Sequence, residues 1–148
     1  MVFRLIYVSA ASEHFDVTTI PSILRISRDN NSRDGVTGLL LFAGGSFLQV
    51  LEGAQQAVET TFARIEQDPR HAWIVRLREG EAPARTFPAW SMGWHDCAPG
   101  DEVDGLLQNI TGRDDVLGLA TGAAPEIDGI LDAFASRKLG GTPTAIGV

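Results

Sequence analysis

A side-chain amide and a phenol each stand in the middle of an apolar, strand-like run. Gln49 lies within SFLQVLEG (46–53), and Tyr7 lies within VFRLIYVS (2–9). Because side chains alternate between the two faces of a strand, Gln49 shares a face with Phe47 and Leu51, and this face is expected to be buried. An unpaired buried amide costs about 1–3 kcal/mol, so Gln49 needs hydrogen-bond partners. A phenol is a suitable partner, and a Tyr7–Gln49 hydrogen bond is therefore predicted.

That bond leaves the amide with unused hydrogen-bonding sites, which a bound ligand could fill. The simpler interpretation is that the tyrosine and the glutamine form a satisfied pair in an ordinary core. Polar residues near two predicted helix ends favour the ligand, because the amides of Asn30 and Asn31 and the guanidinium of Arg64 suit an anionic ligand tail. Taken one at a time, Asn30-Asn31 could be a helix C-cap, and Arg64 with Asp68 a surface i,i+4 pair.

The spacing of apolar residues predicts the elements that position these side chains. Helices are expected at 16–29, with Pro21 in the first turn, and from Gly53 to near Asp68-Pro69. Strands are expected at 2–9, 36–42, 46–53, 73–79 and 89–95, the second and third forming a hairpin. The order βαββαββ predicts an α+β, ferredoxin-like sandwich in which a mixed five-stranded sheet carries both long helices on one face.

The last third of the chain carries two further amphipathic patterns. The apolar positions at helical spacing are Val103, Leu106, Leu107 and Ile110, and then Ile127, Ile130, Leu131 and Phe134. Two such helices need an apolar surface to cover, and the opposite face of the sheet or a second subunit would provide one. We therefore expect a domain at 1–96, a helical extension at 97–140 on the opposite sheet face, and a loose tail at 141–148.

Composition disfavours several classes of protein. The chain has 148 residues, 44% of them hydrophobic, which predicts one globular domain with a substantial core. Twelve basic and nineteen acidic residues give a net charge of −7, which disfavours direct binding to nucleic acid. No apolar run approaches membrane-spanning length, no signal-peptide core is present, and the single Cys97 fits a reducing compartment. We expect a cytoplasmic protein with no membrane partner.

The residue types needed for metal or hydrolytic chemistry do not occur at useful spacings. His14, His71 and His95 are scattered and do not have the spacing of metal ligands, so no metal site is predicted. Gly44-Gly45 is better explained as a turn than as a phosphate-binding loop. No serine, histidine and aspartate set suggests a hydrolase.

Five motifs occur in order along residues 2–94. They are Leu5-Ile6-Tyr7-x-Ser9, Asn30-Asn31-x-x-Asp34-Gly35-Val36-Thr37-Gly38-Leu39-Leu40, Phe47-Leu48-Gln49-Val50-Leu51-Glu52-Gly53, Asp68-Pro69-Arg70-His71 and Phe87-Pro88-x-Trp90-Ser91-Met92-Gly93. Together they closely resemble the BLUF family, blue-light sensors that use FAD. Any one of them alone would be a weak signal, but five at family-like spacing are highly specific.

The resemblance implies a binding mode and a set of site residues. FAD is expected to lie non-covalently between the two long helices, with its ring edge above the central strands. The implied signalling residues are Tyr7, Gln49, Trp90 and Met92. The implied cofactor-binding residues are Asn30, Asn31, Arg64, Asp68, Gln49, Ser27, Leu24, Ile65 and His71.

The resemblance also implies a photochemical mechanism. Excited flavin takes an electron and then a proton from Tyr7 through Gln49, and the hydrogen bonds of the amide to the flavin are then rearranged by rotation or tautomerisation. The product has a red-shifted spectrum and no covalent change. Tyrosine provides an oxidisable ring with a transferable proton, and glutamine can both donate and accept. Trp90 and Met92 share a predicted strand face and either transmit the state or are plain core residues, and the role of Trp94 stays open.

The implied function is that of a photoreceptor and not of an enzyme. Its light state would alter the binding of a separate downstream protein or of a second subunit, and a homo-oligomer is expected. Two alternatives remain at this point. One is a small flavoprotein reductase, for which no nicotinamide site is recognisable, and the other is a ferredoxin-like interaction module without flavin.

Overall fold

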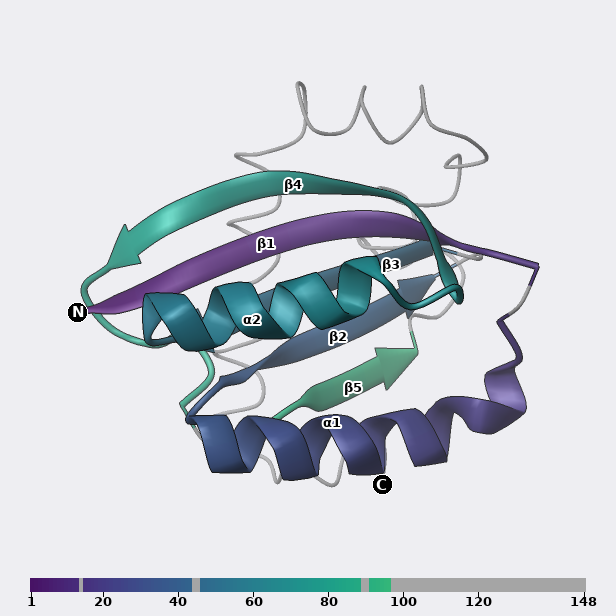
Figure 1. The fold of residues 1–148 in the computed structure, drawn as a ribbon, viewed down its shortest axis with the longest axis horizontal. Coiled ribbons are helices and arrows are strands. Elements are labelled where there is room, and N and C mark those ends of the chain that lie inside the picture. Colours follow the sequence, from purple (N-terminus) through teal and green to yellow (C-terminus); the bar gives the residue numbers. More distant parts are fainter. Residues whose placement is uncertain (14, 44–45, 89–90, 97–148) are drawn as a thin grey trace.

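The computed structural model describes residues 1–13, 15–43, 46–88 and 91–96, and Figure 1 shows how their elements are arranged. The elements are β1 (Val2–Ala11), a 3-10 helix η1 (Val17–Thr19), α1 (Ile20–Asp34), β2 (Thr37–Ala43), β3 (Ser46–Gly53), α2 (Gln55–Glu66), β4 (His71–Ala82) and β5 (Gly93–Asp96). Neither long helix of this part of the chain has the length and hydropathy needed to cross a membrane.

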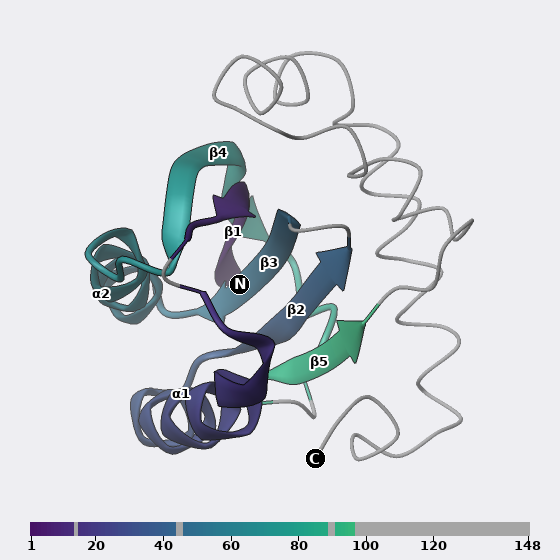
Figure 2. The ribbon, with the colours of Figure 1, turned by 90° about the vertical axis from the view of Figure 1, so that its right-hand side faces the viewer.

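Five strands form one mixed sheet in the order β4-β1-β3-β2-β5. β1 runs antiparallel to both β3 and β4, β2 runs antiparallel to β3, and β5 runs parallel to β2. The two perpendicular views of Figures 1 and 2 place α1 and α2 on the same face of this sheet. The predicted α+β, ferredoxin-like sandwich is thus confirmed for the residues that the structure describes.

The core between the sheet and the helices follows from alternation along the strands. In β1, every second side chain (Phe3, Leu5 and Tyr7) faces the helices and is at most 8% exposed. The other buried members of this core are Leu24, Val36, Leu40, Phe47, Leu51, Val58, Phe62 and Met92. Gln49 points to the same side as Phe47 and Leu51, so its amide lies within an apolar layer.

The other face of the sheet is buried as well. Its central side chains Ile6, Val8, Leu39, Leu48 and Val50 are all at most 1% exposed. Burial on both faces explains why the strands read as nearly continuous apolar runs rather than as strict alternation. The helical extension predicted at 97–140 and the tail predicted at 141–148 lie outside the described residues.

The first long helix differs from its prediction at both ends. α1 covers Ile20–Asp34 instead of 16–29, so Asn30 and Asn31 lie in its last turns and do not form a C-cap or a loop. The helix ends instead at Gly35, whose φ of 73° is left-handed, a conformation that costs residues with a side chain about 1–2 kcal/mol. The polar run at 30–32 resembles a turn, but Asn31 is only 2% exposed because it packs toward the sheet.

Two strands also differ from their predictions. β4 is longer than 73–79 because it pairs with the whole of β1, from Val2↔Ala82 to Ala11↔His71. β5 begins at Gly93 and not at residue 89, since its ladder with β2 starts at Leu39↔Gly93. Met92 therefore lies just before β5, and the prediction that it sits on a strand face is wrong. Trp90 lies outside the described residues.

Two glycines allow a test of this fold, because they are needed for different reasons. Gly35 has a strained φ but open space around it, whereas a Cβ on Gly38 would lie 1.8 Å from the Val50 carbonyl oxygen of the neighbouring strand. We expect Gly35→Ala to lower the free energy of unfolding by about 1–2 kcal/mol and Gly38→Ala to lower it by roughly 3 kcal/mol or more. Denaturant titration measures both values, and equal losses would contradict the β2–β3 register.

Candidate functional site

Tyr7, Gln49 and Met92 form a continuous chain of hydrogen bonds inside the protein. Tyr7 and Gln49 are direct neighbours on β1 and β3, and the Tyr7 hydroxyl donates a hydrogen bond to Oε1 of Gln49. Nε2 of Gln49 in turn donates to Sδ of Met92 at 3.3 Å. The predicted Tyr7–Gln49 hydrogen bond is therefore present, and the thioether of Met92 is the second partner of the amide.

The phenol of Tyr7 is fully enclosed. Its ring lies 5.3 Å from that of Phe62 on α2 and 6.1 Å from that of His71, measured between centroids. Burial, with a smaller contribution from the charge of Asp68, raises the pKa of Tyr7 far above that of a free phenol. Tyr7 is accordingly a neutral hydrogen-bond donor whose proton has one acceptor at hand, the carboxamide oxygen of Gln49.

A cavity of about 230 Å³ lies between α1 and α2 and reaches down to the sheet. Gln49 of β3 and Leu40 of β2 are the sheet residues in its lining. The other lining residues are Ile23, Ile26, Ser27, Asn30, Asn31, Thr61, Arg64, Ile65, Asp68, Arg70 and His71. The amide of Gln49 thus borders the cavity on one side and contacts Tyr7 on the other.

The cavity brings together most of the residues predicted from the sequence. Ser27, Asn30, Asn31, Gln49, Arg64, Ile65, Asp68 and His71 all contribute to its lining. Leu24 does not, because it is fully buried and lines a smaller neighbouring cavity of about 30 Å³ with Phe15 and Phe47. Trp90 cannot be placed relative to the cavity, since it lies outside the described residues.

Two side chains of α1 hold the segment that contains Met92. Nδ2 of Asn31 donates to the carbonyl oxygen of Ser91 at 2.7 Å, and Nε of Arg28 donates to that of Met92 at 2.8 Å. Both bonds fix backbone, so the position of the Met92 thioether depends on α1 as well as on the sheet. Arg28 was not among the predicted site residues, because its partner is 64 positions away in the sequence.

The charged residues at the mouth of the cavity do not form the i,i+4 pair that was the simpler alternative for Arg64 and Asp68. Arg64 binds Asp34 at 3.0 Å, while Asp68 binds Arg70 at 2.6 Å, so the i,i+4 pair of Arg64 with Asp68 does not form. Hydrogen bonds from Arg33 and Arg64 lower the pKa of Asp34 to about 2. Burial works against ionisation of Asp68, but hydrogen bonds from Arg70 outweigh it and lower the pKa of that carboxyl.

The lining has the chemistry that a flavin requires. Four aliphatic side chains (Ile23, Ile26, Leu40 and Ile65) offer contact surface for a flat ring, and the amides of Asn30, Asn31 and Gln49 offer donors and acceptors for a polar ring edge. The volume is slightly below the roughly 300–1,000 Å³ of small-molecule pockets, so it suits the ring system rather than a whole dinucleotide. The thioether sulfur that Gln49 contacts is a weak acceptor, so a stronger acceptor in the cavity could compete for Nε2.

Several lining residues were missed at the level of sequence, although helical spacing could have found them. Ile23, Ser27 and Asn30 follow one stripe of α1 at i, i+4 and i+7, and Thr61, Ile65 and Asp68 repeat that spacing along α2 and the turn after it. Ser27, Asn30, Ile65 and Asp68 were among the predicted site residues. Ile23 and Thr61 on the same stripes were not, because they look like ordinary core and surface residues.

Comparison with known proteins gives a consistent result. The family model described as "BLUF: Sensors of blue-light using FAD" matches residues 2–93. The blue light- and temperature-regulated antirepressor BluF of Escherichia coli (strain K12) is 41% identical over 110 residues, covering 74% of this chain and 27% of that protein. Photoactivated adenylate cyclase subunit beta of Euglena longa is 33% identical over 89 residues, covering 60% of this chain and 10% of the cyclase.

Two solved structures are similar over most of the chain. BlrB, a BLUF protein in its dark state, has a TM-score of 0.72 and 29% identity, covering 92% of this chain and 96% of that chain. BlsA in its photo-activated state has a TM-score of 0.74 and 26% identity, covering 91% of this chain and 95% of that chain. Both are proteins of about this length.

The shared region is the sensor part of the larger relatives. The chain spans 27% of the antirepressor and 10% of the cyclase, so it shares with the cyclase its sensor segment and not an enzymatic one. FAD is the cofactor by which the matching family is defined. On the matched residues 2–93, the chain belongs to the BLUF family, the sensors of blue light using FAD.

Proposed function

We propose that this chain is a blue-light receptor that binds FAD non-covalently in the cavity between α1 and α2 and signals through Tyr7 and Gln49. The observation that carries the proposal is the hydrogen-bond chain Tyr7–Gln49–Met92, whose central amide borders the cavity. When bound there, flavin would supply an excited state that accepts an electron. The remaining chemistry belongs to residues of this chain.

Tyr7 is suited to give up first an electron and then a proton. With flavin bound, one electron would leave the Tyr7 ring for it, and the proton would then leave the Tyr7 hydroxyl for Oε1 of Gln49, the acceptor already in contact. Because burial raises the pKa of Tyr7, the phenol keeps its proton until the electron has gone. Both would return to Tyr7 in the dark, so the cycle would have no net redox change.

The amide of Gln49 has two hydrogen-bonding arrangements that differ at Met92. In the arrangement seen here, Oε1 accepts from Tyr7 and Nε2 donates to the Met92 sulfur. If the amide is reversed, the sulfur faces an oxygen and loses its donor, because a thioether can only accept. The Met92 contact therefore distinguishes the two states, and it lies directly before β5.

The cavity offers separate groups for the parts of the cofactor. We assign Asn30, Asn31 and Gln49 to polar contacts with the ring, and Ser27 and Ile65 to the walls beside it. Arg64 and His71 are assigned to the cofactor as well, with Asp68 acting through its ion pair with Arg70. Leu24 supports the wall from the smaller cavity behind it.

The signal is proposed to reach another protein or a second copy of this chain. The relatives include an antirepressor and adenylate cyclases, so effectors of quite different kinds occur together with this domain. In this chain, the change at Met92 and at Trp90 would pass through β5 to the extension at 97–140.

Colour and spectrum test the photochemistry. The purified chain, loaded with FAD, should be yellow and should shift reversibly to the red under blue light. Tyr7→Phe should keep the colour and lose the shift, because the phenylalanine ring has no proton to transfer. Ser46→Ala is the matched control, because it also removes a buried hydroxyl, in this case from β3. It should behave like the wild type. Light-driven bleaching with nicotinamide oxidation would point instead to a reductase, and a colourless protein to an interaction module.

A second prediction concerns the predicted extension. Hydrogen exchange of residues 98–138 should differ between the dark and illuminated protein, because the signal is expected to pass through this segment. Tyr7→Phe serves as the control, since it absorbs the same light. Identical exchange in both states of the wild type would contradict transmission through this segment.

A third prediction concerns His71, whose Nδ1 lies 2.8 Å from the hydroxyl of Ser9. Burial, reinforced by Arg70 and partly offset by Asp68, lowers the pKa of His71 to about 4. The unfolded chain, with a histidine pKa of about 6.5, binds more protons than the folded one in the window between these two values. Stability should therefore fall as the pH falls from about 6.5 to about 4, by roughly 3 kcal/mol at most.

Denaturant titration at several pH values across that window measures this effect. His71→Asn keeps a polar partner for Ser9 and removes the titrating group, so it should lack this part of the pH dependence. Asp34 does not affect this window. Its pKa is lowered from 3.8 to about 2, so the stability that it provides is lost only as the pH falls below about 3.8. A His71→Asn variant with the same slope as the wild type would show that His71 is not held neutral by burial.

A further inference from the structure

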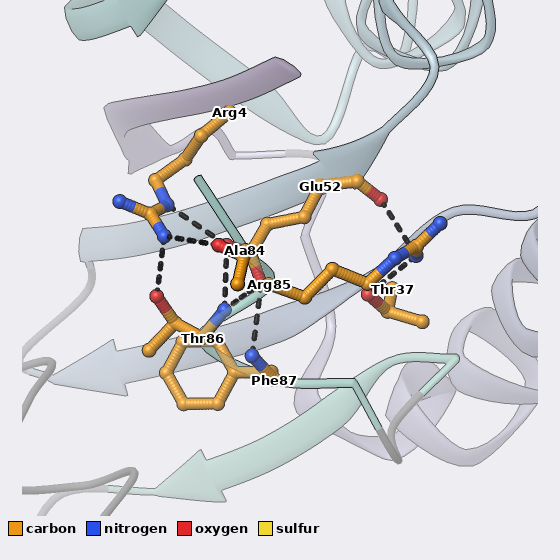
Figure 3. Close-up of polar contacts among 7 residues, drawn as sticks. All are labelled: Arg4, Thr37, Glu52, Ala84, Arg85, Thr86 and Phe87. Atoms are coloured by element: carbon orange, nitrogen blue, oxygen red, sulfur yellow. Dashed lines mark hydrogen bonds and ion pairs between the residues drawn. The ribbon is translucent and has the colours of Figure 1, made fainter. Parts of the chain in front are cut away.

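A second polar cluster, separate from the cavity, joins three strands to the segment that follows β4 (Figure 3). Its centre is Glu52, which is fully buried and whose Oε2 lies 2.8 Å from Nε of Arg4. The carboxylate also accepts hydrogen bonds from the backbone N–H groups of Thr86 and Phe87, each at 2.9 Å. A buried charge is costly unless it is paired and hydrogen-bonded, and this one is both.

Two arginines extend the cluster on either side of Glu52. Arg4 donates to the Thr86 hydroxyl at 2.6 Å and to the Ala84 carbonyl oxygen at 3.2 Å. Arg85 donates to the hydroxyl of Thr37 at 2.8 Å and to the carbonyl oxygen of Gly35 at 2.9 Å. We call these residues (Arg4, Thr37, Glu52, Arg85 and Thr86) the Glu52 cluster.

The cluster fixes the chain between β4 and Met92 at its upstream end. Phe87 and Ser91 are four residues apart, so the backbone between them spans at most about 14 Å. At the downstream end, Ser91 and Met92 are held by Asn31 and Arg28 of α1. The cluster also holds Gly35, the residue that ends α1, so it contacts the helix that provides the downstream anchor.

The same strand carries the switch and the cluster on its two faces. Gln49 points toward the cavity, whereas Glu52, three residues later on β3, points to the opposite face. Arg4 and Thr37 are the direct neighbours of Glu52 on β1 and β2, so the charge lies in a row across three strands. The row therefore includes β1 and β3, the strands that carry Tyr7 and Gln49.

We infer that Glu52 is a positioning residue for the contact between Gln49 and Met92. By holding residues 84–87 against the sheet, it determines where the Met92 sulfur lies relative to the carboxamide. The inference rests on the proposed function, in which that contact distinguishes the two states of the amide. Alternatively, Glu52 would only cap the backbone at residues 84–87 and stabilise the fold without changing the position of Met92. Experiment can separate this capping role from the positioning role.

The direct measurement is the ε-methyl signal of Met92 by NMR. The chain has two methionines, and Met1 is 84% exposed, so it serves as an internal reference. Glu52→Gln keeps the shape of the side chain and loses the charge that pairs with Arg4. It should shift or broaden the Met92 methyl signal and leave that of Met1 unchanged. This measurement needs neither light nor the red shift, so it is independent of the proposed function.

The second measurement is the rate of dark recovery in the chain loaded with FAD. Glu52→Gln should keep the red shift but recover about three- to tenfold more slowly. Recovery re-forms the hydrogen bond from Gln49 to Met92, and the variant has lost about one hydrogen bond's worth of the stabilisation of that arrangement. Met92→Leu removes the sulfur, so adding Glu52→Gln to it should change the rate by less than about 1.5-fold. Arg85→Lys loses the paired hydrogen bonds to Thr37 and Gly35, so it should also slow recovery. It replaces Glu52→Gln in the experiment if that variant does not fold.

Val8→Ala is the control for general loss of stability, since Val8 is buried on the opposite face of the sheet, outside both the core that contains Met92 and the cavity lining. It should lower Tm without altering the Met92 methyl signal or the recovery rate. The inference is overturned if Glu52→Gln leaves the Met92 signal unchanged, or if it slows recovery equally with and without the Met92 sulfur. A wild type without any red shift whose Met92 signal still responds to Glu52→Gln would contradict the proposed function and support the positioning role.

Discussion

The hydrogen bond that Tyr7 donates to Gln49 is the constraint around which this domain is organised. It requires a phenol and a carboxamide to face each other inside an apolar layer, where neither tolerates the loss of its partner. The antiparallel register of β1 and β3 provides this placement, because Tyr7 and Gln49 are direct neighbours. The amide also donates a hydrogen bond to the sulfur of Met92 on one side, and it borders the cavity on the other.

Much of the surrounding structure serves to hold Met92, which no regular ladder fixes. Arg28 and Asn31 reach from α1 to the backbone at Ser91 and Met92, and the Glu52 cluster holds the chain upstream. These are polar contacts to backbone, and such contacts define position more sharply than apolar packing does. A sulfur placed in this way can respond to a reversal of the amide without a rearrangement of the core, which suits a switch that must return to its starting state.

Sequence reasoning predicted those features that depend on neighbours along the chain. The order of the elements predicted the sheet with two helices on one face. The Tyr7–Gln49 bond followed from alternation in the two apolar runs together with the neighbouring positions of the first and third strands in such a sheet. The end of α1 was misplaced, because the local polarity of Asn30-Asn31 resembles a turn while burial of Asn31 favours helix. The partners of Arg28 and Arg64 could not be predicted either, since they lie 64 and 30 positions away and depend on the completed fold.

The central claim is that the carboxamide of Gln49 exchanges its hydrogen bonds in light while Tyr7 remains its neighbour. Infrared difference spectroscopy tests this most directly. The side-chain carbonyl carbon of glutamine is isotope-labelled, and spectra of the FAD-loaded chain are recorded in darkness and under blue light. The account predicts an isotope-sensitive carbonyl band that shifts in light, returns in darkness and is absent from Gln49→Leu. A spectral red shift with no isotope-sensitive band would contradict it.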